Sequence, residues 1–276
     1  PFWTDFGSPS HLLLRRGAEE SLVKTFPPGS GMLREYAAFA LNHYVKGEFF
    51  IPMTIPMRLG GMGDGILKIL PKSPRSDRVA QAPCFVYQNH LVFALISMNP
   101  FIGSLQTDVE NAQSNARGSF AFFSHNAFSF PNAQFISNTT ILSFRKLRIP
   151  CMNRSFSQRT KRLVGALTIS MFDRPLHRLG FSETTRFGVQ IAIDTIKECV
   201  LKKNMTPQQI VHFMYSAQPI AFIPSIWYEI ESIVSSGSED PIENVRALRS
   251  IALRKIDMLS TTSNFTLSSK EHYQRI

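Results

Sequence analysis

Hydrophobic positions recur at helical spacing near both ends of the chain. Between residues 33 and 45 the apolar side chains follow one another three and four positions apart, and Gly47 comes shortly after them. The same spacing returns at 187–201 and at 242–259. Because residues three and four apart share one face of a helix, these stretches predict amphipathic helices. We therefore expect one helix near the start of the chain and a helical region at its end.

The order of residues at 206–209, Thr-Pro-Gln-Gln, is a helix-start signal. A threonine can cap the first turn, and a proline fits the first helical position because it lacks the N–H that would go unused there. A glutamine three residues after the cap can return a hydrogen bond to it. We expect a helix to begin at Pro207.

The middle of the chain has a different pattern. Between residues 84 and 172, short runs of Phe, Ile, Val and Thr alternate with Asn, Pro, Gly and Ser, which is typical of strands and turns. Charge is almost absent between 79 and 144, which indicates a sheet buried on one face or at an interface. The expected strands are 84–87, 91–97, 119–123, 128–130, 135–144 and 163–172.

Residues 49–70 predict a hairpin. Pro52 and Pro56 forbid a helix at 49–57, so that stretch is expected to be extended. The glycine-rich residues that follow match neither common phosphate-binding loop. Asp64-Gly65 between apolar flanks is instead a turn signal, and we expect the hairpin to turn there.

These patterns predict an α+β fold. A β-rich central region, either an antiparallel sheet or a sandwich, is expected between an N-terminal helix and a C-terminal helical region. The predicted divisions are an irregular segment with one helix and a hairpin at 1–78, a β-rich domain ending in a basic stretch at 79–178, and a helical region with a frayed tail at 179–276.

The charge is concentrated in one place. The chain of 276 residues has 30 Lys and Arg against 20 Asp and Glu, a net charge of +10. Residues 145–178 contribute nine cations against Asp173 alone, which is a net of +8. Seven of the nine are arginines, whose planar fork suits phosphate and carboxylate groups. The predicted anion-binding residues are Arg145, Lys146, Arg148, Arg154, Arg159, Lys161, Arg162, Arg174 and Arg178.

This stretch indicates a non-enzymatic binding or assembly protein. RNA is the first expected partner and an acidic membrane surface the second; a solvated surface loop is the alternative reading of the charge. If strands 135–144 and 163–172 are neighbours, Arg145, Lys146 and Arg148 would lie beside Lys161 and Arg162 at one end of the sheet. The low-charge, Phe-rich region would suit self-association. Basic, β-rich matrix or nucleocapsid proteins of RNA viruses and ribonucleoprotein components share this style of composition.

The other class of function is an enzyme that acts on a phosphate or carboxylate substrate held by arginine clamps. No catalytic, metal-binding or cofactor signature supports it. Folding could bring Cys151 together with His177 and Asp173 as a triad, but any long chain permits such a combination. The three cysteines are few and widely spaced, and unpaired cysteines suit a reducing compartment. No apolar run is long enough to span a membrane. We expect an intracellular protein of the cytoplasm, nucleus or an organelle, soluble or peripheral, without metal or cofactor.

Overall fold

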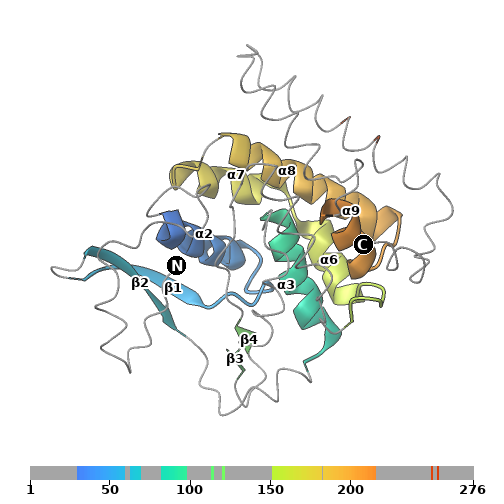
Figure 1. The fold of residues 1–276 in the computed structure, drawn as a ribbon, viewed down its shortest axis with the longest axis horizontal. Coiled ribbons are helices and arrows are strands. Elements are labelled where there is room, and N and C mark those ends of the chain that lie inside the picture. The colour runs from blue at the N-terminus through green and yellow to red at the C-terminus, as the bar shows by residue number, and fades with distance from the viewer. Residues whose placement is uncertain are drawn as a thin grey trace, which may run out of the picture.

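The computed structural model describes residues 30–59, 63–69, 82–97, 113–114, 120–121, 151–181, 183–215, 250 and 254. This part of the chain is mostly helical, with two small antiparallel sheets of two strands each (Figure 1). The helices are α2 (Ser30–Tyr44), α3 (Cys84–Ile96), α6 (Gln158–Ala166), α7 (Ile169–Arg178), α8 (Glu183–Lys197), the π-helix η2 (Glu198–Lys202) and α9 (Pro207–Tyr215). The strands are β1 (Met53–Leu59), β2 (Gly63–Ile69), β3 (Gln113–Ser114) and β4 (Phe120–Ala121).

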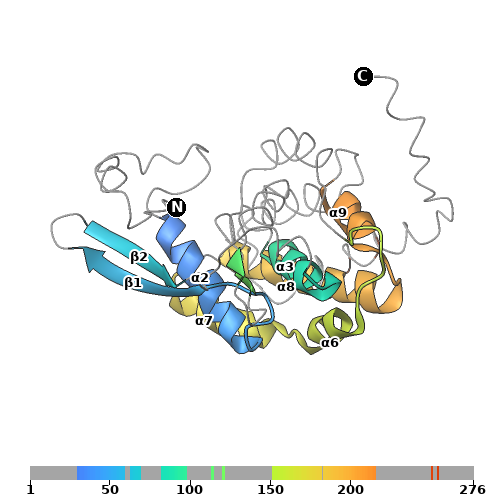
Figure 2. The ribbon, with the colours of Figure 1, turned by 90° about the horizontal axis from the view of Figure 1, so that it is seen from below.

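Helix α3 lies at the centre of the described body. It packs against α6, α8 and α9, while α2 packs against α7 and β1. Both ribbon views place the β1–β2 hairpin at one end and α9 at the other (Figures 1 and 2). The core between the helices is apolar, and Phe49, Phe93 and Phe172 are among its largest fully buried side chains. Burial of this kind supplies most of the driving force for folding.

The predicted N-terminal helix is confirmed as α2. Its apolar face is buried through Ala37, Ala38 and Leu41. Two hydrogen bonds close the end of the helix: Lys46 N–H donates to His43 O, and Gly47 N–H donates to Asn42 O. Both residues at this end have positive φ, 55° at Lys46 and 80° at Gly47. Glycine adopts this left-handed conformation readily, whereas a lysine does so at a cost.

A buried ion pair fixes the hairpin to this helix. Lys68 of β2 pairs with Glu35 of α2, and their side chains are only 4% and 0% exposed. Arg34 is buried beside Glu35, and burial lowers the pKa of its guanidinium to about 10. Charges withdrawn from water in this way are tolerated only when they are paired.

The hairpin is confirmed, but its turn is not where the sequence predicted it. Asp64 pairs with Arg58 and Gly65 with Met57, so both residues belong to β2. The strands are joined instead through residues 60–62, where the adjacent Gly60 and Gly61 stand. On the face that carries Met53 and Ile69, these two paired residues are about half exposed.

The predicted central sandwich is wrong within the described residues. The expected strands 84–87 and 91–97 form the single helix α3, which is buried from Val86 to Ile96. The expected strand 163–172 is the end of α6 and the start of α7, separated by extended backbone at Leu167 and Thr168. Of 119–123 only Phe120–Ala121 is described as a strand. The expected strands 128–130 and 135–144 lie outside the described residues.

Helix α3 was predicted as strands because its complete burial leaves no helical period of apolar and polar residues. A helix covered on every side has apolar residues all round, and a short apolar run of this kind looks like a buried strand. What remains is an α+β composition in the coarse sense, with helices and small sheets.

The helices expected at 187–201 and from Pro207 are confirmed. Helix α8 runs into η2, and α9 begins at Pro207. Its start has the predicted capping box: Gln209 N–H donates to Thr206 Oγ1 at 3.3 Å, and Thr206 N–H donates to Gln209 Oε1 at 2.8 Å. Of the stretch 242–259 the structure describes residues 250 and 254, and both are helical. Within the described residues no helix has the length and apolar character to cross a membrane.

Candidate anion-binding surface

Six of the nine predicted cationic residues are described. Arg145, Lys146 and Arg148 lie outside the described residues. Arg154 is exposed in the turn before α6, and the remaining five are divided between two helices. Helix α6 carries Arg159, Lys161 and Arg162, and helix α7 carries Arg174 and Arg178.

A buried amide holds the start of α6 in place. Ser157 caps the helix, its hydroxyl accepting a hydrogen bond from Thr160 N–H at 3.1 Å. The side chain of Gln88, from α3, accepts from Ser157 N–H at 2.8 Å and donates to Ser155 O at 3.1 Å. The Thr160 hydroxyl donates to the same amide oxygen at 3.3 Å. Because Gln88 is 2% exposed, these bonds are shielded from water and set where α6 begins.

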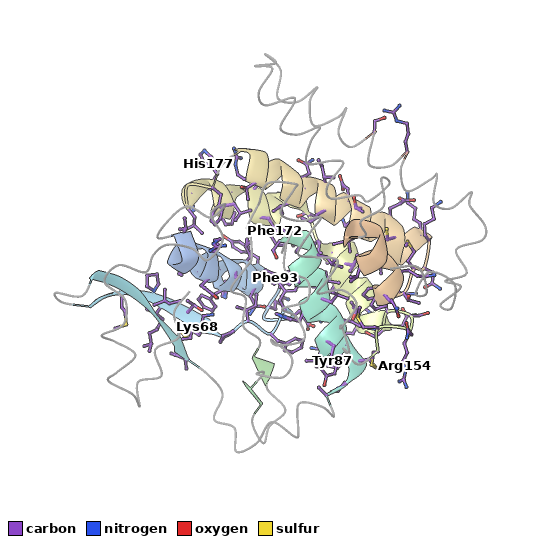
Figure 3. All side chains as sticks on the ribbon, in the orientation of Figure 1. Lys68, Tyr87, Phe93, Arg154, Phe172 and His177 are labelled. Carbon is purple, nitrogen blue, oxygen red and sulfur yellow. A yellow bond between two sulfur atoms is a disulfide. The ribbon has the colours of Figure 1, made fainter. Side chains whose placement is uncertain are left out.

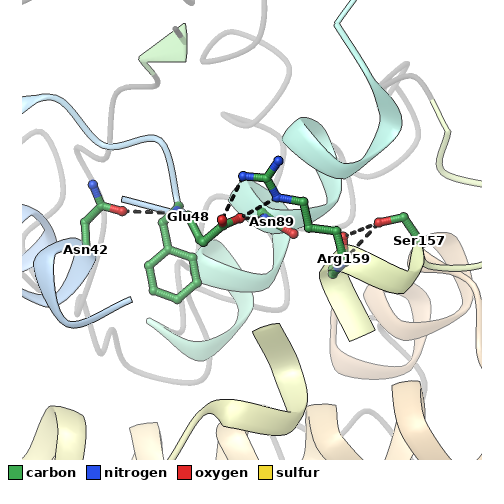
Figure 4. A network of polar contacts seen from close by, with 7 residues as sticks. Asn42, Glu48, Asn89, Ser157 and Arg159 are labelled. Carbon is green, nitrogen blue, oxygen red and sulfur yellow. Dashed lines mark hydrogen bonds and ion pairs between the residues drawn. The ribbon is translucent and has the colours of Figure 1, made fainter. Parts of the chain in front are cut away.

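Arg159 is engaged within the protein. Its Nε and Nη2 donate to the two carboxylate oxygens of Glu48 at 3.0 and 2.7 Å (Figure 4). Its guanidinium lies 4.1 Å from the ring centre of Phe85. Asn89 donates to the same carboxylate at 2.9 Å. The hydrogen bond to Glu48 raises the pKa of Arg159. This residue therefore connects α6 to α3 and to the end of α2, which is a structural role.

Lys161 and Arg162 belong to a second, more open group. Lys161 Nζ donates to Asn204 Oδ1 at 2.7 Å, which brings α6 beside the end of η2. Lys202 and Lys203 stand there, both exposed. Lys202 pairs with Glu198 at 2.7 Å while its side chain stays 72% exposed. We call Lys161, Arg162, Lys202 and Lys203 the α6–η2 basic surface.

Arg174 and Arg178 form a separate pair on α7. They are four residues apart on the helix and both are exposed. Asp173 on the same helix is held by Arg186 of α8 at 2.6 Å. The helix continues through Pro175, although a proline usually interrupts a helix. Helix α7 closes with Gly180 at φ 80°, the position where a left-handed residue is needed.

The two groups lie on different helices. Helices α6 and α7 occupy different parts of the body in both ribbon views (Figures 1 and 2). In Figure 3, His177, beside Arg178 in sequence, lies at the upper left of the helices and Arg154 at their lower right. The arrangement expected at one end of a sheet rested on a strand at 163–172, and that strand is replaced by helices. Anion binding by the nine residues stays a prediction.

Lys202 and Lys203 were missed because charge was counted over long segments. Residues 179–276 have ten cations and ten anions, and this balance hides the adjacent lysines. The available signal was their position directly after the predicted helix 187–201, where basic side chains favour the helix C-terminus. Their proximity to Lys161 could not be read from the sequence, because it depends on the packing of α6 against η2.

The cysteines differ from the expectation that they are unpaired. Cys84 and Cys151 form a disulfide across 67 residues, so Cys151 is not a free thiol nucleophile while this bond is intact. The cysteine content therefore no longer supports a reducing compartment. Cys199 is free but fully buried, and burial raises the pKa of its thiol to about 12. Within the part of the chain that the structure describes, no three His, Cys, Asp or Glu residues gather as metal ligands.

The comparisons with known proteins add no family to these observations. No protein-family model matches the chain, and no curated protein is significantly similar to it in sequence.

Proposed function

We propose that this chain is a non-enzymatic binding or assembly protein that contacts RNA through the α6–η2 basic surface. The observation that carries the proposal is the contact between Lys161 and Asn204. It joins cations from two segments some forty residues apart in the chain into one group, in which Lys161 is partly exposed and the others are exposed. The group has four cations against Glu198, which is a local net of +3. Clustered charge of one sign attracts an anionic polymer and is relieved by it.

The chemistry of the group favours a phosphate backbone. Arg162 is exposed and has no ion pair with another described residue, so its fork is available to a phosphate. The lysines beside it act as point charges that follow a flexible backbone without reading its sequence. Arg159 contributes less, because Glu48 already occupies its fork. An acidic membrane surface is the second partner class, and an enzyme with arginine clamps stays the alternative function.

The proposal is tested by the salt dependence of RNA binding. The affinity of the full chain for a labelled single-stranded RNA oligonucleotide is measured by fluorescence anisotropy over a range of salt concentrations. Each lost phosphate contact reduces the logarithmic slope by about 0.7 for a single strand. The double variant Lys202→Ala/Lys203→Ala should therefore lower the slope by about 1.4. Arg162→Ala should lower it by about 0.7, and the charge-conserving Arg162→Lys should leave it unchanged.

An unchanged slope in the double variant would reject this surface as the RNA contact. Binding to vesicles with anionic headgroups, together with no binding to the oligonucleotide, would assign the surface to a membrane instead. The expected self-association through the low-charge region 79–144 is checked separately, by sedimentation of the free protein. It stays a prediction, since most of that region lies outside the described residues.

A further inference from the structure

The disulfide between Cys84 and Cys151 lies in an asymmetric environment. Cys84 is the first residue of α3, where backbone N–H groups point outward and no acidic residue stands in the first turn. Cys151 lies in a turn with φ 68°, outside any helix. The two sulfur atoms of the disulfide therefore lie in different electrostatic environments.

Arg154 adds a positive charge on the side of Cys84. Its Nη1 donates to Cys84 Sγ at 3.9 Å, and its side chain is otherwise exposed at the edge of the body (Figure 3). A nearby cation stabilises a thiolate, and so does a helix N-terminus. When the bond breaks, negative charge is accommodated more easily on Cys84 than on Cys151.

Both cysteines can be reached by a small thiol. Cys84 and Cys151 are each partly exposed, whereas Cys199 is fully buried in η2. Cys199 therefore cannot compete in the folded protein. The bond has an accessible attack site at Cys151 and a better leaving group at Cys84, and both conditions favour exchange.

We propose that Cys84–Cys151 is a thiol–disulfide exchange site with Cys84 as the leaving sulfur. The thiolate of an external dithiol attacks Cys151 Sγ, forms a mixed disulfide with it and breaks its bond to Cys84, which departs as a thiolate. The second thiol of the reductant then closes the reductant's own disulfide and releases Cys151 as a thiol. Two electrons pass from the dithiol to the protein, and the reaction runs in reverse with an external disulfide as oxidant. This site does not depend on the proposed RNA contact.

The first test identifies the sulfur that is attacked. The full chain is incubated briefly with limiting glutathione, quenched with acid and digested for mass spectrometry. We expect the glutathione adduct on Cys151 and a free thiol at Cys84. An adduct on Cys84 would overturn the assignment, and so would alkylation of all three cysteines in the unfolded protein before any reductant is added.

The second test measures the contribution of Arg154. The variant Arg154→Ala should slow reduction of the disulfide by dithiothreitol about threefold, because it removes a unit charge about 4 Å from the leaving sulfur. The control Arg254→Ala makes the same change at another exposed arginine and should leave the rate unchanged. In urea the two variants should be reduced at equal rates, because the contact is lost. Equal rates in the folded state would overturn the role of Arg154.

Discussion

Replacing Gln88 by methionine should loosen α6 from α3. The two side chains have similar length, so Gln88→Met changes the chemistry of a buried position with little change in its volume. The native amide accepts hydrogen bonds from Ser157 N–H and the Thr160 hydroxyl, and donates to Ser155 O. A thioether replaces none of these well.

The size of the effect follows from what each partner loses. Ser157 N–H is left without its acceptor at a part-buried site, which costs about 1–3 kcal/mol. Ser155 is exposed, so water can replace the amide at its carbonyl oxygen. The Thr160 hydroxyl keeps Ser157 Oγ at 2.8 Å. The lost bonds of Gln88 to Ser155 O and to the Thr160 hydroxyl together add about 1 kcal/mol. The expected destabilisation is therefore about 3 kcal/mol.

Urea denaturation followed by circular dichroism measures this loss as a lower midpoint at an unchanged slope. The matched control is Gln158→Met, which makes the same change at an exposed position in the first turn of α6. The control should alter the free energy of unfolding by less than about 0.5 kcal/mol. Equal effects of the two substitutions would refute the idea that Gln88 anchors α6.

Three further results are expected. A double-mutant cycle of Glu48→Gln and Arg159→Gln should give a coupling energy of about 1 kcal/mol in urea denaturation, because the pair is bidentate yet half exposed; additive effects would contradict this. Lys46→Gly should raise the free energy of unfolding by about 1 kcal/mol, since it relieves a left-handed lysine, while Lys46→Ala should bring no such gain. The raised pKa of Cys199 contributes stability below about pH 9, and this stability is lost as pH rises toward about 12. The difference in unfolding free energy between the native chain and Cys199→Ala should therefore shrink over that range. A constant difference would contradict the raised pKa.

The sequence was most informative where local chemistry alone decides the structure. The cap at Thr206 and Pro207 needs only neighbouring residues, and the structure reproduces it. The amphipathic stretch 33–45 has one apolar face, so its period identified α2. Helix α3 was misread as strands because tertiary packing covers all of its sides, which removes the period.

For the candidate anion-binding surface, the sequence predicted the basic residues of one segment but not which residues lie beside them in the fold. Lys161 belongs to a basic stretch that is visible in the sequence, but it contacts Asn204, next to Lys202 and Lys203 on another helix. The same holds for Arg159, whose partner Glu48 is 111 residues away. Pairing of Cys84 with Cys151 likewise depends on a long-range approach that spacing cannot specify.

Three consecutive polar residues in the buried centre of α3 determine how that helix can sit. Gln88 contacts the start of α6, Asn89 contacts Glu48, and His90 Nδ1 lies 3.4 Å from Phe49 O. Successive side chains on a helix point about 100° apart, so these contacts lie in three different directions. A turn of the helix about its axis, or a slide by one residue, would break all three together. Apolar contacts alone would allow α3 several rotations and axial positions in the core. The three polar contacts are satisfied together in only one of them, so they fix the orientation of the central helix.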